Sequence, residues 1–313
     1  MFLELRHLRT VAMLRDTGSI AQAAQRLHLT QSALSHQLKA LEDYYGLALF
    51  MRKAKPLRFT PAGQQVLALA DRVLPAFAAA ERELARLAGG RAGRLHIAIE
   101  CHSCFDWLIP TLDSFRDHWP EVEMDILTSI SFAPLPALSR GAADLVVTSD
   151  PVDDPAVRYE PLFRYQGMLA MAKTHPLVAK PWIAPADLVG ETLITYPVER
   201  GRLDVFKHFL TPAGVEPRAV RTTELTAMIM QLVASRRGVA ALPSWVLTEY
   251  LARDYVVARP LGARPFWCTV FAAARRTDSE LPFLRDFLAT ARETAFQVLH
   301  GIRAANERED QRS

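Results

Sequence analysis

Five polar side chains cluster in a segment that reads T-Q-S-A-L-S-H-Q-L-K: Gln31, Ser32, Ser35, His36 and Lys39. The apolar residues between them face the other way on a helix, which leaves the five on its outer face. Glutamine can pair with adenine edges, serine can bond to bases or phosphates, and histidine can donate to guanine acceptors. The pattern predicts a helix that enters the major groove of duplex DNA with its N-terminal end.

Positive charge surrounds this helix. Residues 1–60 hold nine Arg and Lys but four Asp and Glu, an excess of the kind that phosphate binding requires. Arg52, Lys53 and Lys55 lie at the Pro-containing tip of a segment whose two ends look like strands. We expect this tip to contact phosphates or the adjacent minor groove.

A second group of polar residues follows predicted strands farther along the chain. Small ligands of open α/β sheets bind at the carboxyl ends of strands, where hydroxyls and arginines would hold a carboxylate and acids would hold an ammonium. The sequence therefore predicts a site for a small amino acid. Its candidate residues are Glu100, Cys101, His102, Ser103, Cys104, Ser129, Ile130, Thr148, Ser149, Asp150, Tyr196, Arg200 and Arg202.

Cys101, His102 and Cys104 form a C-H-x-C group that has several interpretations. Structural zinc takes four ligands, and no second Cys/His pair stands at the usual spacing, so we expect no metal here. Nothing in the sequence indicates a thiol of lowered pKa for a redox switch. Lining of the ligand pocket and simple burial at a strand end stay open as equal alternatives.

The elements that position the first group are predicted from periodicity and caps. Helices are expected over residues 4–16, 20–27 and 31–45, followed by a β-hairpin wing over residues 49–60. Thr60-Pro61 starts a long helix that reaches about residue 88, with a kink expected at Pro75. Its apolar residues repeat in a heptad pattern, which predicts packing against a second copy of the chain through Val66, Val73, Phe77, Leu84 and Leu87.

After a glycine-rich hinge at residues 89–93, strands and helices alternate. This alternation predicts helices that cover a mostly parallel sheet, and its length favours two small α/β lobes with a cleft between them. The expected fold class is mixed: an all-α winged helix-turn-helix (1–60), a linker and dimerisation helix (61–90) and a two-lobed α/β ligand-binding domain (91–303). Lobe I takes about residues 91–162 and 267–303, lobe II about 163–266, and 304–313 form a charged tail.

Composition and motifs exclude several classes. The chain has 313 residues, half of them hydrophobic, and a formal net charge of +3, so disorder is excluded. No apolar run approaches the length of a membrane span, and the first residues carry charges where a signal peptide is apolar, so we expect a cytoplasmic protein with free thiols. G-x-S-x-G, Walker, H-E-x-x-H and G-x-G-x-x-G motifs are absent, so we expect no enzyme and no cofactor.

The stretch SIAQAAQRLHLTQSALSHQLKALEDYYGLALFMRKAKPLRFTPAGQQVLALA resembles the signature of LysR-type transcription regulators. The resemblance covers the whole chain, because the two-lobed half fits the periplasmic-binding-protein-like effector domain of that family. Most members carry Arg at the position of His36, which implies an altered base preference. The resemblance implies an interrupted palindromic operator, a homodimer or homotetramer, and a contact with RNA polymerase.

Longer segments, such as IAIECHSCFDWLIP and GVAALPSWV, resemble the branch of this family that activates methionine biosynthesis. That resemblance implies homocysteine as the effector. Two alternatives stay open: a regulator of another pathway with a different small effector, and a small-molecule-binding protein that works alone.

Overall fold

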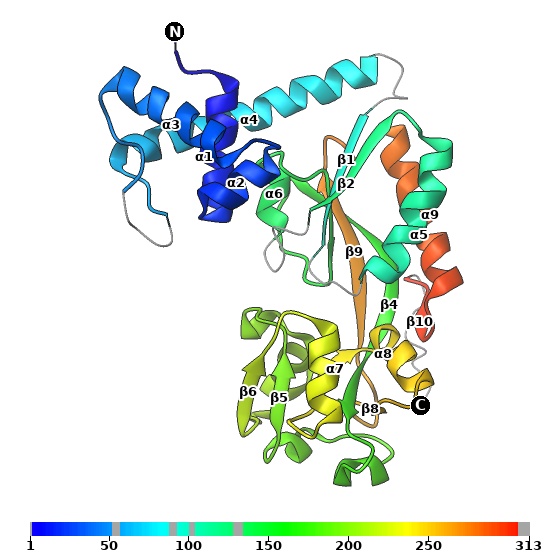
Figure 1. The fold of residues 1–313 in the computed structure, drawn as a ribbon. Helices are drawn as coiled ribbons and strands as arrows, with labels where there is room; N and C mark the ends of the chain where they lie inside the picture. Colours follow the sequence, from blue (N-terminus) through cyan, green and yellow to red (C-terminus); the bar gives the residue numbers. More distant parts are fainter. Residues whose placement is uncertain (1, 52–56, 88–92, 100–103, 128–133, 306–313) are drawn as a thin grey trace.

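The structure is a computed structural model that describes residues 2–51, 57–87, 93–99, 104–127 and 134–305. Figure 1 shows a small helical domain, a long helix that leads away from it, and two lobes joined by long strands. The predicted hinge at 89–93 lies almost wholly outside the described residues, and so do the wing tip and the charged tail. None of the described helices has a stretch apolar and long enough to cross a bilayer.

Three helices form the small domain at the positions that the sequence predicts: α1 (Leu5–Thr17), α2 (Ile20–Arg26) and α3 (Gln31–Tyr45). Ala23 and Ala24 on α2 and Leu34 and Leu38 on α3 are buried in one cluster with Leu14. Small residues on α2 allow the two helices to cross closely. Buried apolar surface on their shared face leaves the opposite face of α3 in solvent.

The long helix α4 (Pro61–Leu87) begins where Thr60 caps it. The Thr60 hydroxyl accepts from the Gly63 amide and donates to the Ala48 carbonyl, which ties the helix start to the wing. A Cβ at Gly63 would stand 2.1 Å from the Leu49 carbonyl oxygen, so this position requires glycine for close approach. The N-terminus of α4 is therefore fixed to the helical domain.

The second half of the chain contains a sheet of eight strands and a separate pair. The strands are β1 (Gly93–Ile99), β2 (Val122–Leu127), β3 (Leu145–Thr148), β4 (Val157–Met171), β5 (Thr192–Thr195), β6 (Ala219–Thr222), β7 (Ala240–Pro243), β8 (Val257–Pro260), β9 (Trp267–Arg275) and β10 (Ile302–Arg303). The main path runs β10-β4-β9-β3-β1-β2, with β7 and β8 paired to β4, while β5 and β6 pair in parallel.

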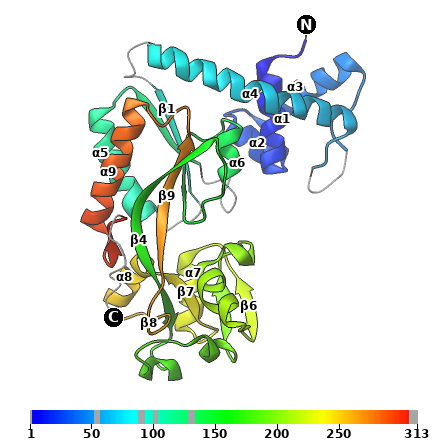
Figure 2. The same cartoon turned by 180° about the vertical axis from the view of Figure 1, so that it is seen from behind.

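The prediction of a mostly parallel sheet is wrong for the main sheet. Strand β1 is parallel to β2 and β3, but β9 is antiparallel to both β3 and β4, and β7, β8 and β10 are antiparallel to β4. In both views, β4 and β9 run side by side from the upper lobe into the lower one (Figures 1 and 2). The chain passes from lobe I to lobe II along β4 and returns along β9. Because the two strands run in opposite directions, they pair as antiparallel neighbours.

The sequence predicts a strand over residues 168–172 at this point in the chain, whereas β4 has 15 residues and begins at Val157. Pro161 interrupts the periodic pattern, and the pairing register with β9 shifts between Pro161 and Phe163. A bulge of this kind accommodates a proline inside a strand. Strands β7 and β10 have only four and two residues, too few to show a periodic pattern in the sequence.

Helices pack on both lobes, as the alternating pattern predicts. Lobe I carries α5 (Phe105–His118), α6 (Leu135–Ser139) and α9 (Pro282–Val298), whereas lobe II carries α7 (Thr226–Ala234) and α8 (Ser244–Ala252). Phe115 on α5 meets Phe287 on α9 edge to face at 5.2 Å. Short 3₁₀ turns complete lobe II: η3 (Pro176–Ala179), η4 (Pro185–Leu188), η5 (Arg200–Arg202) and η7 (Thr211–Ala213). The sequence predicts an ordinary helix over residues 203–210, but the structure has a π-helix there, η6 (Val205–Leu210).

A buried carboxylate stabilises lobe I. Asp144, which is 5% exposed, accepts hydrogen bonds from Arg94, Arg275 and the His96 amide. Burial by itself raises the pKa of Asp144, but the bonds from Arg94 and the charge of Arg275 outweigh it, so the pKa lies below its ordinary value. The ionised carboxylate is therefore favoured in the folded protein.

We expect Asp144→Asn to lower the free energy of unfolding by about 2 kcal/mol at neutral pH. The loss is moderate because Arg275 keeps bonds to Asp278 and to two backbone carbonyls. A depressed folded-state pKa gives stability that is present above about pH 4 and is lost as the pH falls through the folded-state value. Urea denaturation across this range should show the two proteins converging in acid; a constant difference would contradict the assignment.

Candidate DNA interface and ligand pocket

The outer face of α3 presents the five predicted DNA-reading residues together. Gln31, Ser32, Ser35, His36 and Lys39 are all exposed, while the opposite face is buried. Thr30 caps the helix by accepting from the Ala33 amide at 3.1 Å. The cap fixes where the helix begins and so which residues stand at its exposed N-terminal end.

The turn between α2 and α3 holds His28 with φ of +54°, in the left-handed region. Histidine visits this region more often than most non-glycine residues do. The turn allows α3 to cross α2 within four residues of its end. This arrangement is that of a helix-turn-helix in which α3 is free to enter a groove.

The base of the predicted wing is present beside α3. Phe50 and Phe59 form an antiparallel bridge, and their rings lie 5.1 Å apart. The Met51 amide donates to the Arg58 carbonyl at 2.8 Å. The basic tip residues Arg52, Lys53 and Lys55 lie outside the described residues, so their contact with DNA stays a prediction. Arg58, at the base, is exposed.

The predicted dimerisation face of α4 is half-buried in its first half and exposed in its second half. Val66 and Val73 are half-buried, whereas Phe77 and Leu84 are 41% and 65% exposed. Nothing is described of the Leu87 side chain. On another face, Ala78 is buried, and a Cβ at Gly141 of lobe I would lie 3.3 Å from its side chain. The helix thus contacts its own lobe I and still exposes Phe77 and Leu84, and packing of this edge against a second copy stays a prediction.

A cavity of about 130 Å³ lies where the two lobes meet. Strand β3 of lobe I and strand β5 of lobe II both end at it, so the carboxyl ends of two strands converge there, as the sequence predicts. Its polar lining comes from Ser149, Asp150, Tyr165, Thr195, Tyr196, Arg202 and Asp204. Its apolar lining includes Gly167, Val198, Leu203, Leu242 and Phe266.

An ion pair joins the lobes at one wall of this cavity. Asp150 accepts from Arg202 at 2.8 Å and from Lys207 at 3.0 Å. Burial raises the pKa of Asp150, but the two cationic donors outweigh burial and hold the pKa below its ordinary value. A second, more open cavity of about 440 Å³ also has Asp150 and Arg202 in its lining. The pair therefore stands at the boundary between the two cavities.

Four of the thirteen predicted ligand residues line the smaller cavity: Ser149, Asp150, Tyr196 and Arg202. Thr148 is buried behind them, and its hydroxyl accepts from the Asp150 amide at 3.0 Å. Cys104 is 5% exposed in the core of lobe I, which favours the structural alternative for this cysteine.

Arg200 does not line the cavity. It pairs with Glu216, and its guanidinium stands 4.0 Å from the centre of the Phe206 ring. The sequence selected both Arg200 and Arg202 as ligand residues, but only Arg202 lines the cavity. The other predicted residues, Glu100, Cys101, His102, Ser103, Ser129 and Ile130, lie outside the described residues.

Sequence reasoning missed Tyr165, Thr195 and Asp204. Thr195 is the last residue of β5, so the same strand-end rule that selected Tyr196 applied to it as well. It is 4% exposed, and its hydroxyl has no hydrogen-bond partner among the described residues. An unpaired buried hydroxyl costs free energy, so Thr195 is a candidate group for binding a ligand in this cavity.

Two family descriptions match this chain. Residues 5–64 match the bacterial regulatory helix-turn-helix proteins of the lysR family, and residues 88–295 match the LysR substrate binding domain. The first covers the three helices and the wing, and the second covers both lobes.

The chain is also similar throughout its length to characterised proteins. It is 44% identical over 305 residues to a transcriptional regulator named MetR from Haemophilus influenzae, covering 97% of this chain and 98% of that protein. The MetR protein of Escherichia coli is 45% identical over 97% of this chain and 94% of its own. The regulatory domain of the MetR protein from N. meningitidis superposes with a TM-score of 0.62 at 42% identity, over 67% of this chain and 97% of that domain.

Proposed function

The chain belongs to the LysR family of bacterial transcription regulators, and on that basis we propose that it controls methionine-biosynthesis genes in response to homocysteine. The exposed polar face of α3 beside the wing is the observation that carries the DNA-binding part. The proposed pathway is supported by near-full-length similarity to proteins named MetR.

The inter-lobe cavity supports a small amino acid as the effector. An α-amino acid carries one carboxylate and one ammonium, which match Arg202 and Asp150 respectively. A ligand with both charges can insert into this pair and leave neither partner without a counter-charge. A ligand with only an ammonium would take Asp150 and leave Arg202 without its counter-charge, which is costly in a confined site.

The remaining groups suit a short side chain. Thr195 offers an unpaired hydroxyl, and Leu203 and Phe266 form an apolar wall. Homocysteine combines the two charges with a short chain that ends in a thiol. The cavity volume of about 130 Å³ fits a molecule of this class better than a large ligand.

The proposed mechanism couples this cavity to DNA through lobe closure. Asp150 belongs to lobe I, whereas Arg202 and Lys207 belong to lobe II, so insertion of a ligand changes the contacts that hold the lobes together. Strands β4 and β9 connect the lobes, and α4 leads from lobe I to the helix-turn-helix domain. A change in closure would shift the arrangement of subunits on an interrupted palindromic operator.

A mobility-shift and footprinting experiment with methionine-pathway promoters tests the DNA-binding part. We expect a footprint over two half-sites one or more helical turns apart, with an affinity that falls as salt is raised. If these promoters gave no salt-sensitive footprint while other promoters of the same genome were bound, the proposed methionine pathway would be rejected. The assignment as a DNA-binding regulator would stand.

Calorimetry with homocysteine, methionine and cysteine tests the effector. We expect heat of binding from homocysteine and an altered footprint in its presence. The matched control is the amine that results from decarboxylation of homocysteine, which should bind at least about tenfold more weakly because Asp150 and Arg202 are no longer both satisfied. No heat from homocysteine, with heat from another amino acid, would favour a regulator of a different pathway.

The Thr195 hydroxyl gives a further test of the same cavity. We expect Thr195→Val to weaken effector binding about tenfold, because the ligand loses one hydrogen bond at a buried position. Thr195→Ser keeps the hydroxyl and should bind nearly as well as the original protein. Equal affinities for the valine and serine variants in calorimetry would show that the ligand does not use this group.

A further inference from the structure

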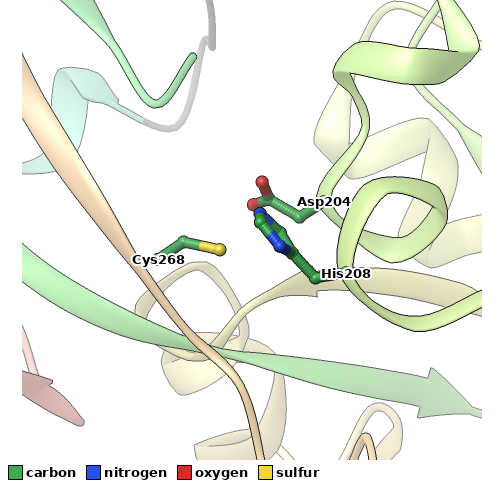
Figure 3. A group of neighbouring side chains, drawn as sticks. All are labelled: Asp204, His208 and Cys268. Carbon is green, nitrogen blue, oxygen red and sulfur yellow. The ribbon is translucent and has the colours of Figure 1, made fainter. Parts of the chain in front are cut away.

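Three side chains of different chemistry meet where lobe II contacts strand β9. Asp204 and His208 are four residues apart around the π-helix η6, and Cys268 lies on β9. One ligand atom of each residue lies within 4.8 Å of the other two. Figure 3 shows the sulfur of Cys268 pointing toward Asp204 and His208.

Hydrogen bonds connect Cys268 and Tyr165 to Asp204 in the absence of a cation. Tyr165, the partner of Cys268 across the β4–β9 pairing, donates its hydroxyl to Asp204. Burial, with the nearby charge of Asp204, raises the pKa of the Cys268 thiol well above its ordinary value. Burial also raises the pKa of Asp204, although the Tyr165 hydroxyl opposes that shift.

Carboxylate, imidazole and thiolate are the three ligand types that zinc takes in proteins. His208 is exposed, and its ring lies 5.6 Å from that of Phe266. One ring nitrogen of His208 already lies within 4.8 Å of a ligand atom of Asp204 and of Cys268. A π-turn inside a helical segment is itself frequent at functional sites.

We propose that Asp204, His208 and Cys268 bind a thiophilic divalent cation, zinc in the first place, at the wall of the inter-lobe cavity. On binding, the cation replaces the proton of the Cys268 thiol, and that proton passes to solvent. Asp204 also lines the cavity, so an exogenous fourth ligand would approach the cation from that side. Three protein ligands and one open position are the arrangement of a zinc ion that can accept an exogenous ligand. The site goes beyond the proposed effector and does not depend on its identity.

Titration of the full-length, metal-free protein with Co²⁺ tests this site, because a cobalt–thiolate bond gives a charge-transfer absorption that no other step produces. We expect one Co²⁺ per chain with this band, and its loss when Zn²⁺ is added. Cys268→Ser should abolish the band. His208→Gln should weaken Co²⁺ binding by at least about tenfold, since even loss of an outer partner of a metal ligand costs that much.

Matched controls keep the result specific. Cys104→Ser should retain the band, because the cluster found among the described residues contains Cys268 and not Cys104. If the cation binds at Cys268 as proposed, Cys101→Ser should retain the band as well. His208 is exposed, so the His208→Gln protein should fold normally, and retained operator binding confirms this for every variant. A band that is lost in Cys101→Ser but kept in Cys268→Ser, or no band in the unaltered protein, would overturn the proposal. No effector is present, so either outcome is independent of homocysteine binding.

Discussion

Replacing Gln31 and His36 together with alanine is expected to lower the affinity for the specific operator by on the order of 100-fold, about 3 kcal/mol. Both side chains are exposed on the outer face of α3, near the end that is expected to enter the groove. Neither contributes to the buried cluster under the helix, so the fold should survive. Binding to unrelated DNA should change little, because phosphate contacts supply non-specific affinity.

Two control variants separate base reading from other effects. Lys39→Ala should weaken binding to all sequences alike and reduce the slope of affinity against salt by about one. Gln64→Ala, an exposed glutamine on α4, should have no effect. Fluorescence anisotropy with operator and scrambled duplexes measures each of these. An equal loss on both duplexes for the double variant would show that α3 does not read bases.

Arg202→Gln is expected to weaken effector binding by about 100-fold, because it removes one partner of a confined charge pair. The Asp150 carboxylate would keep Lys207, while the ligand carboxylate would lose its cation. The matched control lies two residues away. Arg200→Gln removes the same charge from a residue that pairs with Glu216 outside the cavity, and should leave effector affinity unchanged.

Calorimetry with the two glutamine variants measures this difference directly, and operator binding without effector confirms that both are folded. The comparison isolates the position of the charge, since both proteins lose one cation from the same short segment. If both variants lost affinity equally, long-range charge rather than direct contact would explain the effect, and the ligand would have to bind elsewhere.

The helix-turn-helix domain could be predicted almost wholly from the sequence. Its elements are short and local, so caps such as Thr30, the spacing of Ala23, Ala24, Leu34 and Leu38, and the Thr60-Pro61 start indicate each boundary. The exposed face of α3 follows from the same periodicity, because residues that are not buried on a short amphipathic helix must face solvent.

The ligand pocket could be predicted only in part. The rule that ligands bind at strand ends selected Asp150 and Tyr196, but it also selected Arg200 and Cys104, which the structure places elsewhere. Local sequence indicates which residues follow a strand. It does not indicate which side of the chain faces a cleft, because that depends on packing against segments far away in the sequence.

What the sequence by itself determined, therefore, is the helix-turn-helix, the start of α4 and the presence of two α/β lobes, all of which rest on contacts between neighbouring residues. The tertiary structure alone decided that β4 and β9 cross between the lobes as an antiparallel pair. That pairing places Cys268 opposite Tyr165 and beside Asp204, and the packing of the lobes brings Asp150 to Arg202 across 52 residues of chain. Such contacts form only when distant segments pack together, so no local pattern records them.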